Sequence, residues 1–163
     1  MKQSEKSGRE STPARYLDEV PHYLPALLEA SKLGQRAAKV GFDWQNVHEV
    51  FGKLEEETNE LANEVARSEI SQDAIEDELG DLFFTIVSVA RHLKIEPEFA
   101  LRRANRKFRE RFNHMEAAAG GMEPIQNANP EELDRMWRAA KAANELAVAS
   151  PEACESHPET SSD

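Results

Sequence analysis

The sequence has little of what marks a secreted or membrane-embedded protein. Its only cysteine is Cys154, so no disulfide bond can form within the chain. No apolar stretch is long enough to span a bilayer, and the first residues contain no apolar run of the kind found in a signal peptide. We therefore expect a soluble cytoplasmic protein that does not bind membranes.

Positive charge is also scarce, since 31 acidic residues against 20 basic ones give a formal net charge of −11. Such a charge disfavours the wrapping of duplex DNA and the coating of an anionic membrane, so we do not expect nucleic acid as a partner. Residues 91–111 are an exception, because they hold eight basic residues against three acidic ones. This segment leaves nucleic-acid binding as an alternative that would show itself by strong salt dependence.

Both ends of the chain are polar and lack apolar periodicity. Residues 1–18 and 149–163 are rich in Ser, Glu and Pro, and we interpret them as disordered tails. Residues 19–148 are expected to form one folded domain. A domain of that size gains from a partner subunit that helps to bury its core.

Within this domain apolar residues recur with helical spacing, and no segment alternates convincingly as a strand would. The pattern predicts an all-α fold, a helical bundle, with helices over residues 23–39, 45–67, 72–93, 97–119 and from 130 onward. Ser71 and Asn129 are the expected N-caps of the third and fifth helices. Gly120 and Gly121 are expected to end the fourth helix.

Acidic residues are concentrated in KLEEETNE, residues 53–60, where four of the eight are glutamate. Like charges three or four residues apart on a helix repel, so this arrangement calls for a compensating cation. With Leu54 taken as the centre of the apolar stripe of this helix, Glu57 lies at about −60° and Glu60 at about −120°. Both side chains therefore project from one edge of the helix.

The next helix repeats the arrangement. With Ile75 as zero, Glu78 lies at about −60° and Asp81 at about −120°. In an antiparallel hairpin such edges face opposite ways, so we expect the crossing angle, a further helix or a second subunit to close the site. Four converging carboxylates would repel, and hard divalent cations such as Mg²⁺ or Mn²⁺ would reverse that repulsion. A solvated acidic face is the alternative interpretation.

EETNE at 56–60 followed by ELGD at 78–81 resembles the EExxE…ExxD signature of the MazG nucleotide pyrophosphohydrolases. KVGFDW at 39–44, ALRRANRKFRERF at 100–112, and the late Trp137 and Lys141 are similar to further MazG segments in the same order. The resemblance covers about residues 19–145, as one module closest to the C-terminal domain of two-domain members. Thr58 departs from the pattern, because the family usually has an aliphatic residue there.

The resemblance implies an all-α homodimer of the NTP pyrophosphohydrolase type, which hydrolyses nucleoside triphosphates, NTP or dNTP, to monophosphate and pyrophosphate with Mg²⁺ (or Mn²⁺). It makes Glu57, Glu60, Glu78 and Asp81 the metal ligands, with Glu56 beside them as a candidate to activate water. Either nucleotide house-cleaning or control of alarmone levels fits as a physiological role. The alternatives are a related enzyme acting on dUTP or phosphoribosyl-ATP, and a non-catalytic acidic helical protein that binds a partner protein.

Basic residues supply the expected phosphate contacts. Lys107 and Arg111 are spaced i, i+4 along one edge of an apolar stripe, where cations suit phosphate oxygens and the charge that develops during reaction. We predict both substrate-binding and catalytic roles for them. Asn105 falls inside that stripe, where its amide would either orient a catalytic carboxylate or satisfy the backbone.

Three further residues complete the predicted substrate-binding set. The resemblance implies that Trp137 and Lys141 lie near the nucleotide, while a core position for Trp137 is an equal alternative. Lys53, at the start of the acidic segment, is the third.

Overall fold

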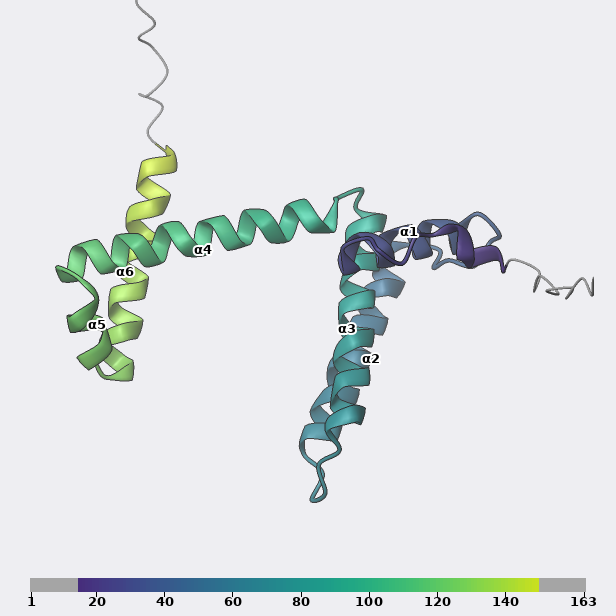
Figure 1. The fold of residues 1–163 in the computed structure, drawn as a ribbon, viewed down its shortest axis with the longest axis horizontal. Coiled ribbons are helices and arrows are strands. Elements are labelled where there is room, and N and C mark those ends of the chain that lie inside the picture. The colour runs from purple at the N-terminus through teal and green to yellow at the C-terminus, as the bar shows by residue number, and fades with distance from the viewer. Residues whose placement is uncertain (1–14, 150–163) are drawn as a thin grey trace, which may run out of the picture. The chain divides into compact units, whose positions relative to one another are not determined.

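The computed structural model describes residues 15–149, with side chains as far as residue 143, and all of its regular structure is helical. This confirms the predicted all-α class. In chain order the elements are η1 (Tyr16–Glu19), α1 (Ala26–Ala38), α2 (Val47–Val65), α3 (Gln72–His92), α4 (Pro97–Ala119), α5 (Met122–Asn127) and α6 (Pro130–Ala149) (Figure 1). The chain divides into two compact units, Met1–Ala100 and Leu101–Asp163, with the boundary inside α4.

Capping residues fix where the helices start, much as the sequence predicts. Ser71 caps α3 by accepting a hydrogen bond from the backbone N–H of Ala74 at 3.3 Å. Asn129 and Glu132 cap the start of α6 reciprocally, because each side chain accepts a hydrogen bond from the other's backbone N–H at 2.9 Å. At the end of α4, Gly120 and Gly121 adopt positive φ angles of 79° and 129°, which glycine tolerates best.

The predicted starts of the first two helices are slightly wrong. The helix expected from residue 23 begins at Ala26, since Pro25 has the extended ψ of 136° and acts as the N-cap. The helix expected from residue 45 begins at Val47, because Asn46 Oδ1 accepts hydrogen bonds from the backbone N–H groups of His48 and Glu49 and so caps the helix. Elements η1 and α5 were not predicted, because four and six residues are too short for periodicity to show.

The N-terminal boundary predicted at residue 19 falls inside η1. Arg36 of α1 places its guanidinium 4.1 Å from the centre of the Tyr16 ring and makes a 2.6 Å ion pair with Glu19. Element η1 is therefore attached to α1. The other parts of both predicted tails, residues 1–14 and 150–163, lie outside the described residues.

In the first unit α2 and α3 run side by side as a hairpin, and α1 packs against α3 (Figure 1). Val50 of α2 and Thr85 and Ser88 of α3 are buried. On a helical wheel with 100° per residue, α2 is measured from Leu54 and α3 from Ile75. These buried positions then lie roughly 40° to 140° to the negative side of each apolar stripe. Val87 of α3 is also buried, at about +120° on the opposite flank, so the covered surface of α3 extends over both flanks of its stripe. The approach of Glu57 and Glu60 to Glu78 places α2 along the acidic flank.

The apolar stripe of α3 is only partly covered as a result. Leu79, Ile86 and Leu93 recur with the helical spacing that predicts a stripe facing the core. They are nevertheless 39%, 46% and 49% exposed, and Phe83 is 52% exposed. That part of the core prediction is wrong for the described chain. An apolar row of this length on one helix is a surface suited to a protein partner.

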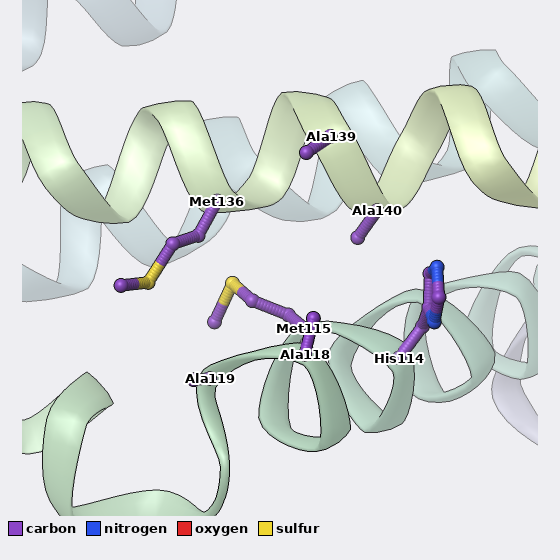
Figure 2. A pocket seen from close by; sticks show the side chains of 7 residues that line it. All are labelled: His114, Met115, Ala118, Ala119, Met136, Ala139 and Ala140. Carbon is purple, nitrogen blue, oxygen red and sulfur yellow. The ribbon is translucent and has the colours of Figure 1, made fainter.

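The second unit has a small core of its own. Met115 of α4, Ile125 of α5 and Ala140 of α6 are buried together, and Trp137 packs against them. A mostly apolar pocket of about 190 Å³ lies beside this core, with His114, Met115, Ala118 and Ala119 on α4 and Met136, Ala139 and Ala140 on α6 (Figure 2). Its lining offers one imidazole as the sole ionisable group, which is too little to recognise a triphosphate.

None of the helices formed by residues 15–149 combines the length and apolar character needed to cross a lipid bilayer.

Candidate metal centre

Three predicted ligands converge within the first unit. Glu57 and Glu60 of α2 and Glu78 of α3 offer carboxylate oxygens that all lie within 4.8 Å of one another. The α2–α3 hairpin alone brings them together. These three residues therefore do not need the further helix or second subunit that the sequence analysis allowed for. The physical reason is the rotated packing, because the seam between the two helices runs along the flank where Glu57 and Glu78 lie.

Glu57 is the acidic residue most enclosed by this seam. Its side chain is 5% exposed, and Lys53 Nζ lies 2.6 Å from Glu57 Oε1. The second oxygen, Glu57 Oε2, is buried and has no hydrogen-bond partner among the described residues. A buried carboxylate oxygen without a partner is unfavourable, and a hard cation with oxygen ligands would satisfy it. The donor set, carboxylates only, fits Mg²⁺ or Mn²⁺ better than zinc.

The electrostatic field of the cluster is visible at Glu78. Burial raises the pKa of the half-buried Glu78 carboxyl above its usual range. The neighbouring carboxylates of Glu60, Glu57, Asp81 and Glu64 add to that rise, in this order. Carboxylates that disfavour one another's ionised forms in this way are the arrangement that a divalent cation stabilises.

The fourth predicted ligand, Asp81, is not one of the three converging residues. It is exposed and lies one helical turn beyond Glu78 on α3. Its charge reaches the cluster, as the pKa of Glu78 shows. The wheel predicted the correct edge for Asp81 but not its distance from the other three carboxylates.

Glu64 lies one turn further along α2, near enough to contribute to the raised pKa of Glu78, and was not predicted from the sequence. Its side chain is 12% exposed, with Oε1 2.7 Å from Arg67 Nη2. Its Oε2, like that of Glu57, is buried without a hydrogen-bond partner in the described part of the chain. The signal was available in the sequence, because Glu57, Glu60 and Glu64 have the i, i+3, i+7 spacing of a single helix face.

Lys53, predicted to bind substrate, contacts the acidic residues. Its Nζ lies 2.8 Å from Glu56 Oε1, and 2.6 Å from the oxygen of Glu57 described above. Hydrogen bonds to Glu56 and then Glu57 raise the pKa of Lys53 well above its usual range, so the ammonium stays charged. Glu56, the candidate for water activation, is 58% exposed at its side chain.

The other predicted substrate-binding residues belong to the second unit. Lys107, Asn105 and Lys141 are exposed, so the prediction that Asn105 is buried is wrong. Arg111 is half-buried, and its Nε is buried without a hydrogen-bond partner among the described residues. Trp137 lies 5.1 Å from Phe108 between ring centroids and packs on the core cluster, which favours its core role; its nucleotide contact stays a prediction.

The GFDW segment is held by an ionic network that the sequence did not predict. Asp43 accepts two hydrogen bonds from the guanidinium of Arg91, at 2.7 and 2.5 Å, and its Oδ1 lies 3.1 Å from His92 Nε2. The Arg91 hydrogen bonds, more than any other contact, lower the pKa of Asp43 from 3.8 to about 2. Trp44 meets the His92 ring edge-on, with centroids 6.5 Å apart. The network fixes the start of α2 to the end of α3.

The segment that contains the acidic cluster matches a known family domain. Residues 45–116 match the MazG nucleotide pyrophosphohydrolase domain, a range that contains the acidic residues of α2 and α3 described above but not Asp43. It also contains Lys107 and Arg111. Trp137 and Lys141 lie beyond it.

Three curated relatives are similar over most of the chain. A nucleoside triphosphate pyrophosphohydrolase of Escherichia coli K12 is 40% identical over 127 residues, which are 77% of this chain and 48% of the relative. The nucleoside triphosphate pyrophosphohydrolase/pyrophosphatase MazG of Thermotoga maritima is 38% identical over 146 residues, 89% of this chain and 54% of the relative. The protein YabN of Bacillus subtilis is 43% identical over 143 residues, 28% of its length. The chain therefore spans about half the length of the first two.

Proposed function

We propose that the chain, whose residues 45–116 match the MazG domain, is a nucleoside triphosphate pyrophosphohydrolase of the MazG family. It would convert NTP or dNTP to nucleoside monophosphate and pyrophosphate. The names of the Escherichia coli and Thermotoga maritima relatives support this activity. The observation that carries it in this chain is the convergence of Glu57, Glu60 and Glu78, with one buried Glu57 oxygen that has no hydrogen-bond partner among the described residues.

Glu57, Glu60 and Glu78 would hold Mg²⁺, with Asp81 completing the ligand set from the next turn of α3. When bound, such ions activate a water molecule and stabilise charge on the phosphate oxygens. The carboxylate of Glu56, which shares Lys53 with Glu57, is the candidate to accept the proton of the attacking water. Lys107 and Arg111 would donate to the triphosphate, a role supported by the unpartnered Nε of Arg111.

We also propose that two copies of the chain associate. The exposed row of Leu79, Phe83, Ile86 and Leu93 supports this, because it is a continuous apolar face on α3. A second copy offers the same row, and a self-complementary apolar patch is what a two-fold dimer uses. Sedimentation of the wild-type chain as a monomer at micromolar concentration would contradict this proposal.

The activity is tested by product analysis. A panel of NTPs and dNTPs, dUTP included, is incubated with Mg²⁺, and pyrophosphate is separated from orthophosphate. We expect pyrophosphate, turnover that requires the divalent cation, and loss of turnover in Glu57→Gln. The matched control is Glu55→Gln, which removes one charge from an exposed position two residues away and should keep activity. Orthophosphate as the sole primary product would overturn the proposal.

A further inference from the structure

Lys53 occupies a position that a substrate-binding residue does not need. Its ammonium nitrogen lies 2.6 Å from Glu57 Oε1 and 2.8 Å from Glu56 Oε1, at the i+4 and i+3 positions of the same helix. Ion pairs of this spacing on a helix surface are usually weak, because both charged groups are exposed to solvent. This pair differs, because the Glu57 side chain is only 5% exposed.

The same carboxylate is the centre of the candidate metal site. Glu57 is one of the three residues whose oxygens approach within 4.8 Å, and its other oxygen is buried without a partner in the part of the chain that the structure describes. That unpartnered oxygen is the independent sign that the acidic cluster receives a cation. A divalent ion on either oxygen of Glu57 would come within a few ångströms of the Lys53 ammonium, and like charges at that range repel.

The Lys53 side chain is able to leave. It is 35% exposed, and an ammonium on a flexible four-carbon stem can turn into water without breaking any backbone contact. Arg67 holds Glu64 in a similar way at the other end of the acidic row, through a single 2.7 Å contact. Glu64, however, is not among the three converging residues.

We propose that Lys53 competes with the divalent cation for Glu57, so that this lysine sets the metal affinity of the site. Metal loading exchanges one cation for another on Glu57 and releases the ammonium from that carboxylate, while its 2.8 Å contact with the exposed Glu56 can persist. The inference rests on the proposed function for the identity of the substrate, but the competition itself is a property of the chain and the metal alone.

Metal binding without nucleotide tests the proposal. Mn²⁺ is titrated calorimetrically into wild type and Lys53→Gln, whose neutral amide can still donate to Glu57 but carries no charge. We expect Lys53→Gln to bind Mn²⁺ roughly 10-fold tighter, because the repulsion is removed while the hydrogen bond can persist. Lys53→Arg, which keeps the charge, should bind Mn²⁺ no more tightly than wild type.

The matched control is Arg138→Met. It removes one positive charge from another i, i+4 ion pair, the 2.7 Å pair with Asp134, and should leave Mn²⁺ affinity within about twofold of wild type. Equal or weaker Mn²⁺ binding by Lys53→Gln would overturn the proposal and make Lys53 a residue that orients Glu57. If Lys53→Gln does not fold, the same titration on Lys53→Met decides, since it also lacks the charge.

Failure of the proposed function is distinguishable from failure of this inference. If Lys53→Gln binds Mn²⁺ more tightly and wild type hydrolyses no nucleotide, the competition between Lys53 and the metal is supported and the proposed enzymatic activity is refuted. If wild type hydrolyses nucleotides and the Mn²⁺ affinity of Lys53→Gln is unchanged, the proposed activity is supported and the competition between Lys53 and the metal is refuted.

Discussion

Replacing Asp43 with asparagine should destabilise the first unit. Asp43 receives both terminal N–H groups of Arg91, whose side chain is 12% exposed, while that of Asp43 is 23% exposed. The amide of asparagine keeps the shape but loses the charge, and it turns N–H donors toward a guanidinium that has only donors. Asp43→Asn therefore leaves a largely buried cation without its counter-ion.

The size of the effect follows from the pKa of Asp43. A carboxyl whose pKa falls from 3.8 to about 2 on folding contributes about 2.4 kcal/mol at neutral pH. Partial exposure of the pair screens this interaction, so about 1 to 2 kcal/mol is a better expectation for the loss in free energy of unfolding.

The same shift fixes the direction of the pH dependence. The folded pKa is the lower one, so the stabilisation is fully present above pH 4 and is lost as the pH falls toward 2. About half of it should be gone at pH 3. Asp43→Asn cannot titrate at this position, so the difference between the two proteins should shrink between pH 7 and pH 3.

Urea unfolding followed by circular dichroism at both pH values measures these differences. The matched control is Asp134→Asn, which removes one carboxylate from the exposed 2.7 Å pair with Arg138 and should cost less than about 0.5 kcal/mol. Equal losses in the two variants at pH 7, or a difference for Asp43→Asn that does not shrink at pH 3, would refute the reasoning.

Two further predictions concern α1 and α4. A Cβ at Gly34 would lie 3.1 Å from Arg91 Nε, and because Asp43 holds that side chain, Gly34→Ala should destabilise despite a helix-propensity gain of about 1 kcal/mol. The loss should fall in an Asp43→Asn background, and a urea double-mutant cycle without coupling would contradict this. Lys107→Ala should lower kcat/KM by ~10²-fold as one electrostatic donor is lost. It should leave the melting temperature and sedimentation unchanged, and a monomeric variant would instead assign Lys107 to the subunit interface.

Local signals account for most of the fold that the sequence predicted. The caps at Ser71 and Asn129 and the glycine pair after α4 act within a few residues, so their spacing alone determines where helices start and end. The wheel also needed only local geometry to place Glu57, Glu60 and Glu78 on matching edges. These features could be predicted because each depends on one helix at a time.

Long-range contacts could not be read in this way. The contact between Asp43 and Arg91 joins residues 48 positions apart, and nothing in the GFDW segment indicates which basic residue it meets. Trp137 is similar, because its contact with Phe108 depends on how α6 returns to α4. Arg91 and His92 were therefore absent from the predicted set, although both position the start of the helix that carries two of the three converging carboxylates.

The error in the predicted core explains how the acidic site is built. The wheel assumed that each helix faces its neighbour with the centre of its apolar stripe, which would leave Glu57 and Glu78 at the rim. The helices instead meet along the flank, so Glu57 is 4% exposed while Ile86 is 46% exposed. Burial strengthens the hold of carboxylates on a cation, because the effective dielectric constant is lower there. The exposed stripe is then available to the second copy that we propose, so the same rotation of α3 would serve both metal binding and assembly.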